Sequence, residues 1–348
     1  MVSGINGAAD LLRALDAKTI SAEEYATDIV RRVADKKNLN AVSSFDENRL
    51  LSDAKLADAK RSKGTAEILC GLPLIIKDNI NTSAFPTTGG TRALLGHTPK
   101  TNAGVINIIE GEGAIVGAKG GMHELAFGIT SNNSVTGAIR NPHDPSKIAG
   151  GSSGGVASAV AAGIFPAGLG TDTGASVRQP AALCGVVGFR PTTGRYVGDG
   201  IVPISHTRDT AGPIAHSVED IVLLDSVLSK QTESGETTSL SNVTLGVPSE
   251  VFFENLETEV EIAVQAQLRV FEKAGARLVD VSLKDIWAHN EAFGFPVAFY
   301  EVMRDLPAYL TEHAPDISFE PLVANIGSPD VAGAIGSQLG ADAMPEAA

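Results

Sequence analysis

The sequence predicts an α/β fold, and three observations lead to that prediction. The chain has 348 residues, 43% of them hydrophobic, which is enough apolar material for one large domain or two modest ones. Segments with helical periodicity alternate with short apolar runs typical of strands. Glycine turns separate these segments at many points. Helices that alternate with strands in this way favour α/β over all-α architecture.

The first part of the chain supplies helices and two strands. Ser21 and Glu24 form a capping box, the arrangement in which two residues satisfy each other's backbone N–H groups at the start of a helix. We expect five elements before residue 78: a helix over 8–16, a helix from Ser21 to about Val33, a strand over 40–45, a helix over 46–61, and an apolar strand that ends at Lys77.

The alternation continues to about residue 281. We expect a helix over 104–110, a strand over 114–118, a small-residue helix and a short strand within 150–180, a short apolar segment over 182–189, a capped helix from Ser217 to about Leu228, a strand over 243–247, a helix around 260–271, and a strand over 278–281. We expect loops over 127–144 and 208–213, an exposed linker over 230–242, and no packed element after Ser328.

Composition excludes several classes of partner. The formal net charge is −14, which disfavours binding to nucleic-acid phosphates or to an anionic membrane surface. The chain carries neither a signal-peptide pattern nor an apolar run of membrane-spanning length, so we expect a soluble cytoplasmic protein. Cys70 and Cys184 fit reduced, buried thiols. The seven histidines lack metal-ligand spacing, so we expect no metal and no cofactor.

The stretch from Gly150 to Pro180 carries the strongest functional signal. It places Ser152, Ser153 and Ser176 among glycines, which let backbone N–H groups converge on an oxygen atom. Two serine-bearing turns of this kind are typical of an acyl-transfer site. Two structural alternatives remain: a phosphate-binding loop, which the absence of a Gly-Lys-Ser/Thr ending disfavours, and a purely local role for Ser176 as a helix N-cap.

Lys77 is the candidate base. It closes an apolar strand that would carry its side chain into the core, where burial disfavours the ammonium form. A neutral amine of this kind can accept a proton from a serine. The alternative is a surface lysine that pairs with Asp78, and that would be the better interpretation if the two serine motifs were absent.

Lys77, Ser152 and Ser176, together with the spacing of the two serines, resemble the amidase signature enzymes and their Ser–cisSer–Lys triad. The resemblance implies a central mixed β-sheet covered by helices on both faces. It also implies a cis peptide before Ser152 and a single domain over 1–348 with its catalytic core at about 65–228. The family normally continues with a further C-terminal region, so we expect a truncated or shortened form.

The same resemblance assigns roles. Ser176 would be the nucleophile, Ser152 the proton relay and Lys77 the base, with no metal required. The backbone N–H groups of Thr173, Gly174, Ala175 and Ser176 would stabilise the oxyanion, and Ser153 and Met122 would belong to the substrate site. A methyl group at Ala175, where most of the family has glycine, is tolerable if its φ is negative. Met122 is equally well explained as a core methionine. Asp172 and Arg178 are expected to form an ion pair that rigidifies the turn.

The substrate follows from the branch of the family. Met122-His123-Glu124-Leu125 and Thr171-Asp172-Thr173-Gly174-Ala175-Ser176 resemble the indole-3-acetamide hydrolase branch, and residues 202–210 resemble mandelamide hydrolase. We therefore expect an amidase that acts on a small aryl acetamide such as indole-3-acetamide, with mandelamide or another aryl amide as the first alternative. Two further alternatives are the glutaminase subunit of a tRNA-dependent amidotransferase and a non-catalytic truncated remnant. The sequence leaves the oligomeric state open, and a homodimer is one option.

Overall fold

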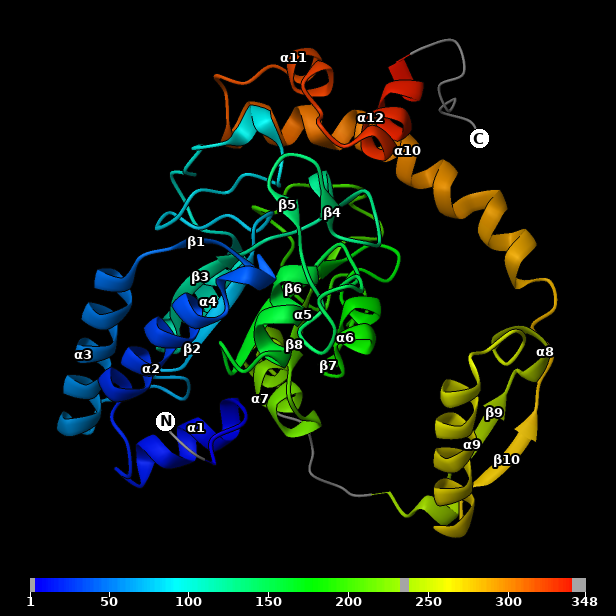
Figure 1. Ribbon diagram of the computed structural model, residues 1–348, viewed down its shortest axis with the longest axis horizontal. Helices are drawn as coiled ribbons and strands as arrows, with labels where there is room; N and C mark the ends of the chain where they lie inside the picture. Colours follow the sequence, from blue (N-terminus) through cyan, green and yellow to red (C-terminus); the bar gives the residue numbers. More distant parts are fainter. Residues whose placement is uncertain (1–3, 232–237, 340–348) are drawn as a thin grey trace. The chain divides into compact units, whose positions relative to one another are not determined.

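The computed structural model describes residues 4–231 and 238–339. These residues fall into two compact units (Figure 1). The first comprises Met1–Gln231 with Val297–Ala348, and the second comprises Thr232–Pro296. The predicted linker over 230–242 lies partly outside the described residues. Each unit is described separately below.

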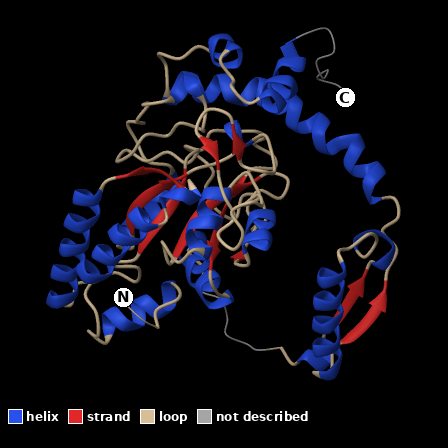
Figure 2. Ribbon diagram, viewed as in Figure 1, coloured by secondary structure: helices blue, strands red, loops and turns tan. Residues whose placement is uncertain are grey.

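A six-stranded mixed sheet forms the centre of the first unit (Figure 2). Its strands follow the order β1-β3-β2-β6-β8-β7. The pairs β3–β2 and β2–β6 are parallel, whereas β1–β3, β6–β8 and β8–β7 are antiparallel. The strands are β1 (Val42–Phe45), β2 (Pro73–Lys77), β3 (Ile115–Gly120), β6 (Ala167–Asp172), β7 (Val187–Gly188) and β8 (Thr210–Ala215). Every residue of β2, β3, β6 and β8 is buried, which is typical of a sheet covered on both faces.

The helices that cover the sheet follow from its parallel connections. Chain order runs from β2 through α4 (Gly104–Gly111) to β3, and then through α5 (Gly154–Ala161) to β6. The two crossovers run in opposite directions along the sheet, and right-handed crossovers then place α4 and α5 on opposite faces. Helix α5 packs against β2, β3 and β6, while α4 packs against β3 and α7. The predicted α/β sheet with helices on both faces is confirmed.

Most predicted elements lie where the sequence places them. The capping box of Ser21 and Glu24 is present, and a second one joins Ser217 and Asp220. The remaining helices of the catalytic region are α1 (Ala8–Asp16), α2 (Ala22–Asp35), α3 (Glu47–Lys63), α6 (Arg178–Cys184) and α7 (Val218–Ser229), with short strands β4 (Asn132–Asn133) and β5 (Gly137–Ala138) in the predicted loop over 127–144. One buried core cluster runs from Ala8 to Leu228.

Two predictions were wrong. The stretch around 208–213 is not only a loop, because Thr210 begins strand β8, which pairs with β6 along its whole length. Gly212 and Pro213 hid this strand from sequence reasoning. The glycine is needed because a Cβ there would meet the carbonyl oxygen of Phe189. The chain after Ser328 also does not lack a packed element: it forms α12 (Pro329–Gly336), which buries Val331 and Ile335.

The segment that follows Val297 packs on the same unit. It contains most of the long helix α10 (Ile286–His313), then α11 (Phe319–Ala324) and α12. Its apolar residues form a second core cluster with Leu94, Leu125 and Val202. The Tyr309 hydroxyl donates to Asn81 Oδ1 at 2.6 Å, and the buried carboxylate of Glu124 accepts from the backbone N–H of Ser328 at 2.7 Å. This segment is therefore part of the body that carries the sheet.

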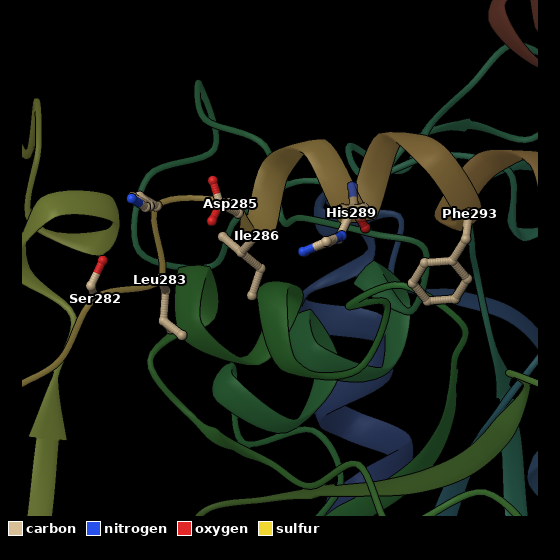
Figure 3. Close-up of a pocket in the computed structure, with 8 residues that line it drawn as sticks. Ser282, Leu283, Asp285, Ile286, His289 and Phe293 are labelled. Carbon is tan, nitrogen blue, oxygen red and sulfur yellow. The ribbon is translucent and has the colours of Figure 1, made fainter.

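The second unit is a small β-α-β arrangement. Strands β9 (Thr244–Val247) and β10 (Arg277–Asp280) pair in parallel, and α9 (Thr258–Lys273) connects them, after a short helix α8 (Ser249–Phe252). A cavity of about 580 Å³ in this unit is lined by residues 282–286, His289, Asn290 and Phe293 (Figure 3). None of the predicted catalytic residues lines it. Among the described residues, no helix is both long and apolar enough to cross a membrane.

Candidate active site

Three parallel strands end together at one edge of the sheet. Lys77 is the last residue of β2, Gly120 of β3 and Asp172 of β6. In open α/β sheets, ligands bind outside the carboxyl ends of such strands. The loop that precedes α5 carries Ser152, and the turn that follows β6 carries Ser176. The topology therefore collects the predicted site residues at the edge where a binding site is expected.

Lys77 is fully buried, and its amine is surrounded by oxygen atoms. Nζ lies 2.7 Å from Ser152 Oγ, 2.7 Å from Thr171 Oγ1 and 3.3 Å from the Thr171 carbonyl oxygen. Burial lowers the pKa of Lys77 to about 7, although the charges of Asp172 and Asp209 oppose the shift. The alternative of a surface lysine paired with Asp78 is wrong, since the side chain of Lys77 has no exposed surface.

Ser152 is held in the loop between β3 and α5. The peptide bond between Gly151 and Ser152 is cis, as the family resemblance implies. Ser152 is fully buried; its Oγ contacts Lys77, and its carbonyl oxygen accepts from the backbone N–H of His123 at 3.2 Å. Gln179 Oε1 accepts from the N–H of Gly151 at 2.8 Å. The loop thus presents one serine hydroxyl directly to the buried amine.

Ser176 lies beside the loop that carries Ser152, and a backbone hydrogen bond joins the two segments. Its carbonyl oxygen accepts from the N–H of Ser153 at 3.1 Å, and 8% of its surface is exposed. Ser153 in turn donates from Oγ to the carbonyl of Thr171 at 3.2 Å. Among the described residues, no hydrogen bond joins the hydroxyls of Ser152 and Ser176. Helix α6 takes Val177 as its N-cap residue, without a side-chain cap, so the alternative of Ser176 as an N-cap is wrong.

The turn over residues 173–176 presents backbone N–H groups. Those of Gly174, Ala175 and Ser176 do not donate to any protein acceptor within the described part of the chain. The φ of Ala175 is 159°, at the edge of the extended region, so the negative φ that we set as the condition for its methyl group is not what the structure has. Thr173 Oγ1 donates to Asp209 Oδ1, which fixes the start of the turn. N–H groups without a protein acceptor are available to donate to an oxyanion.

Asp172 and Arg178 form the predicted ion pair. Arg178 Nη2 lies 3.0 Å from Asp172 Oδ1, and Arg178 Nε lies 3.0 Å from Oδ2. Arg190 adds a second guanidinium at 3.1 Å from Oδ1, and the backbone N–H of Val177 donates to Oδ2. Burial alone would raise the pKa of Asp172, but these hydrogen bonds and charges outweigh burial and hold the pKa below its ordinary value. The carboxylate is therefore charged and braces the turn.

Met122 is completely buried. It packs in a small apolar cluster with Ala126, Ile204 and Ala298. Sequence reasoning left two interpretations, a core residue and the lining of an acyl pocket. The packing accounts for the first, and the second remains a prediction.

Sequence reasoning missed three polar residues of this site. Thr171 bridges Lys77 and the Asn79 amide, which lies 3.0 Å from Thr171 Oγ1. The carboxylate of Asp209 accepts from Thr173 and from the backbone N–H groups of Ile204 and Ser205, at 2.8 Å and 2.9 Å. Thr171 begins the family-like motif over 171–176, but nothing in that motif indicates that its hydroxyl contacts Lys77. The only signal for Asp209 was its place in the family-like segment over 202–210.

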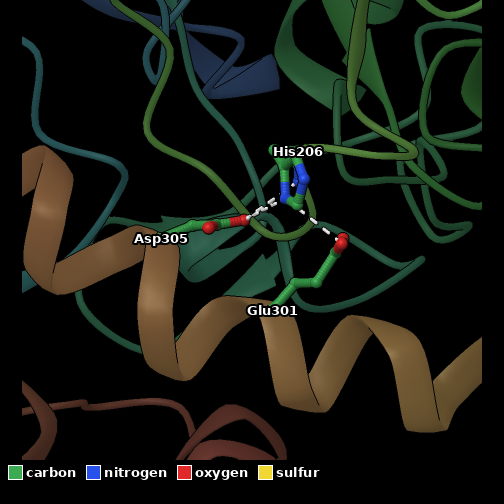
Figure 4. Close-up of side chains that lie close together, drawn as sticks. All are labelled: His206, Glu301 and Asp305. Carbon is green, nitrogen blue, oxygen red and sulfur yellow. Dashed lines mark hydrogen bonds and ion pairs between the residues drawn. The ribbon is translucent and has the colours of Figure 1, made fainter. Parts of the chain in front are cut away.

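The described residues contain one group of three potential metal ligands, His206, Glu301 and Asp305 (Figure 4). These three residues belong to the first unit, and none of them contacts Lys77, Ser152 or Ser176. Arg304 Nη2 lies 2.5 Å from His206 Nδ1, so a guanidinium already provides positive charge at this group.

The fold and this edge of the sheet define the class of protein, an α/β hydrolytic enzyme with a buried lysine beside a serine-rich glycine loop. Residues 24–338 match the Amidase family model. The chain belongs to the amidase family and is an amidase, a hydrolase of amide bonds.

Named relatives agree with this class. An indoleacetamide hydrolase of Rhizobium radiobacter is 44% identical over 335 residues, which are 96% of this chain and 71% of that protein. A mandelamide hydrolase of Pseudomonas putida is 43% identical over 320 residues, covering 90% of this chain and 63% of that protein. The structure of the native peptide amidase from Stenotrophomonas maltophilia matches with a TM-score of 0.82 at 28% identity, covering 93% of this chain and 71% of that one.

Proposed function

We propose that the chain hydrolyses a small aryl acetamide, such as indole-3-acetamide, to the carboxylic acid and ammonia. The proposed reaction passes through an acyl-enzyme on Ser176, with Ser152 and Lys77 as the proton relay. One observation carries the proposal: the fully buried Lys77 amine lies 2.7 Å from the hydroxyl of a fully buried serine in a glycine loop. The likeness to hydrolases named for indoleacetamide and mandelamide supports the class of substrate.

The surroundings of Lys77 suit both of its protonation states. Its three oxygen neighbours can accept the three N–H bonds of an ammonium group. In the neutral amine, a lone pair takes one of these positions and can accept the proton of Ser152. A pKa near 7 makes both forms accessible at neutral pH, which is the best value for a group that takes and then returns a proton.

The chemical steps then balance. Ser176 Oγ attacks the amide carbon; its proton goes to Ser152, and the proton of Ser152 goes to Lys77. The oxyanion accepts hydrogen bonds from the N–H groups of the turn over 173–176. As the C–N bond breaks, the proton returns through Ser152 to the leaving nitrogen, which departs as ammonia. A water molecule then attacks the ester of Ser176, using the same relay, and releases the acid.

This proposal needs the two serine hydroxyls to approach each other. The backbones of residues 153 and 176 are already joined by a hydrogen bond of 3.1 Å. Rotation of the Ser176 side chain is the movement that we expect on substrate binding, because catalytic hydrogen bonds often form fully only in the complex. The neighbouring ion pair of Asp172 and Arg178 keeps the backbone in place while the side chain turns.

The test is ammonia release from indole-3-acetamide, mandelamide, phenylacetamide and glutamine. We expect turnover of the aryl acetamides, and we expect the Ser176→Ala variant to have none. Labelling of Ser176 by a fluorophosphonate probe, located by peptide mass spectrometry, reports the nucleophile independently of the substrate. Turnover of glutamine alone would favour the glutaminase alternative. Folded protein that neither labels nor turns over any amide would favour the non-catalytic remnant and overturn the proposal.

A further inference from the structure

A loop outside the proposed triad connects the oxyanion turn to helix α10. The loop covers residues 204–209, and its last residue is Asp209. One carboxylate oxygen of Asp209 accepts from Thr173 Oγ1, and the other accepts from the N–H groups of Ile204 at 2.8 Å and Ser205 at 2.9 Å. Asp209 therefore ties the first residue of the turn to the beginning of its own loop.

Helix α10 holds the other side of this loop. Glu301, which is 5% exposed, accepts at Oε2 from the hydroxyl of Ser205 and from both the N–H and the hydroxyl of Thr207, at 3.3 Å and 2.9 Å. One helical turn further on, Asp305 Oδ2 accepts from the N–H of His206 at 3.0 Å. Three consecutive loop residues are thus bound by two carboxylates at positions i and i+4 of the helix.

Arg304 adds a cation to the two carboxylates of this contact. Figure 4 shows dashed lines from the imidazole of His206 to the carboxylates of Glu301 and Asp305. Its Nδ1 lies 3.2 Å from Glu301 Oε1 and 3.1 Å from Asp305 Oδ2. Arg304 Nε lies 2.8 Å from Asp305 Oδ1, and its Nη2 lies 3.6 Å from Glu301 Oε1. Since Arg304 supplies a cation to the same group, we assign these carboxylates to holding the loop, not to binding a metal.

Apolar packing runs along the same path. Ile204, the first residue of the loop, packs with Met122 and with Ala298 of α10. Ala298 lies one helical turn before Glu301. The loop therefore lies between α10 on one side and, on the other, the oxyanion turn and the methionine predicted to line the acyl pocket.

We propose that Asp209 and Glu301 are positioning residues for the hydrolysis. Glu301 holds the loop over 204–209 in place. Asp209, at the end of that loop, holds Thr173 and thereby the N–H groups that follow it. This inference rests on the proposed function, because it assumes that the turn over 173–176 receives the oxyanion. Neither carboxylate touches the reacting atoms. Loss of one oxyanion donor costs about 10²–10³-fold in kcat in other enzymes, and a misplaced turn loses part of that effect.

The first test compares single variants. We expect Asp209→Ala and Glu301→Ala to lower kcat, and the rate of fluorophosphonate labelling of Ser176, at least tenfold, with KM nearly unchanged. Glu301→Gln should remain within about threefold of the wild type, because its amide oxygen can still accept from Ser205 and Thr207. The control is Glu312→Ala, which removes the same charge from an exposed position of the same helix.

The second test is a double-mutant cycle with Thr173→Val. This variant removes only the hydroxyl that donates a hydrogen bond to Asp209. If Glu301 acts through Asp209 on Thr173, Glu301→Ala should lower kcat little further in the Thr173→Val background. The fold-loss of kcat in the double variant is then smaller than the product of the two single losses. Multiplicative losses would show that Glu301 acts elsewhere. Should an alanine variant fail to fold, Asp209→Asn and Thr173→Val replace it, because both keep the shape of the site. Each should lower kcat and the rate of labelling of Ser176 if Asp209 positions the turn.

A pH profile separates positioning from charge. Lys77 faces the charges of Asp172 and Asp209, and His123 lies within electrostatic reach. Removal of the Asp209 charge should shift the acid limb of kcat/KM to lower pH, whereas Glu301→Ala should leave the limb in place. Wild-type values for kcat and labelling in both alanine variants would overturn the inference. Absence of labelling at Ser176 in the wild type would instead overturn the proposed function.

Discussion

Two lysines are completely buried at the carboxyl ends of neighbouring strands, and their surroundings differ. Lys77 ends β2, and Lys119 lies next to the end of β3, in register with Ile76. Because side chains alternate along a strand, the two lysines point to opposite faces of the sheet. Both amines have hydroxyl and carbonyl oxygens as neighbours, and Lys119 has a carboxylate in addition. Lys119 Nζ lies 2.6 Å from the carbonyl of Ile80 and 3.9 Å from the carboxylate of Asp78.

This difference separates the amine that we propose as the base from one that binds a loop. Burial lowers both pKa values, that of Lys77 to about 7 and that of Lys119 to about 8, where the adjacent charge of Asp78 opposes the shift. Lys119 binds the loop after β2, at the carbonyl of Ile80 and at Thr87 Oγ1, 2.8 Å away. Its neighbours keep the cation in place, whereas in the proposed reaction Lys77 exchanges a proton with the Ser152 hydroxyl, which lies 2.7 Å away. Burial alone therefore does not identify a catalytic lysine.

The largest expected effect is on turnover. Lys77→Met keeps the length of the side chain but removes the proton acceptor, and we expect kcat to fall by about 10²–10⁴-fold, the usual contribution of a general acid–base group. The matched control, Lys119→Met, removes the other buried amine. Its kcat should fall far less, once activity is corrected for the folded fraction. Equal losses in the two variants would remove the distinction drawn between the lysines.

The free energy of unfolding should fall more in Lys119→Met than in Lys77→Met, the reverse of the order expected for kcat. Lys119→Met leaves the buried carboxylate of Asp78 without its cation, and we expect the free energy of unfolding to fall by about 3–5 kcal/mol. Lys77→Met removes an amine whose burial is itself unfavourable and should cost less. Chemical denaturation monitored by circular dichroism measures both.

The pH dependence of that loss provides the check. Burial raises the pKa of Asp78, and Lys119 opposes this rise, so the pKa should be higher still in Lys119→Met. The unpaired carboxylate becomes neutral as pH falls through that raised pKa, and the difference in unfolding free energy from the wild type should shrink in acid. A difference that grows in acid would contradict the assignment of Asp78 as the partner of Lys119.

The two lysines also show how far sequence reasoning reaches. Both end an apolar run, so the pattern that singles out Lys77 fits Lys119 equally well. Only the serine motifs over 150–180 favoured Lys77, and the structure brings its amine to Ser152 as that reasoning required. The neighbour that separates the two environments, Asp78, is adjacent to Lys77 in sequence but contacts Lys119 in space.

Elements that depend on distant contacts were beyond the sequence. Strand β8 exists because β6 offers it a partner, although Gly212 and Pro213 are poor strand residues. Helix α10 was not predicted, and its sequence contains Gly294, Pro296 and Pro307, which break helical patterns. Local signals such as the capping boxes were read correctly because their partners lie within one turn. The roles of Ser176 and of the turn before it remain predictions.

The pH profile of turnover is the next expected effect. Lys77 is an ammonium group below its folded pKa and a neutral amine above it, so kcat/KM should rise with pH through about 7 and then level off. Initial rates of ammonia release between pH 5.5 and 9.5, with the folded fraction checked at each pH, give the pH at which kcat/KM rises. An acid limb near 4 would point to a carboxylate as the base. The limb should keep its position in Lys119→Met, since that lysine faces the other side of the sheet.

The smallest expected effects come from a matched pair of threonines. Thr171 Oγ1 lies 2.7 Å from Lys77 Nζ, and Thr87 Oγ1 lies 2.8 Å from Lys119 Nζ. Replacing either threonine by valine keeps its shape but removes the hydroxyl that accepts from the lysine. A second hydrogen bond is lost in each variant: the Asn79 amide donates to Thr171 Oγ1 at 3.0 Å, and Thr87 Oγ1 donates to the carbonyl of Ile80 at 3.3 Å. The free energy of unfolding should fall by about 1–3 kcal/mol, because a buried donor loses its acceptor.

Only Thr171→Val should also change catalysis. It removes an acceptor that stabilises the protonated amine, so the acid limb of kcat/KM should move to lower pH and kcat should fall by roughly tenfold, equivalent to about 1.4 kcal/mol of barrier. Thr87→Val should leave both unchanged, because Lys119 exchanges no proton with substrate. If both valine variants lost the same stability and neither changed the pH profile, hydroxyl contacts would not distinguish the two lysines. Contact with Ser152 would then be the whole of the difference.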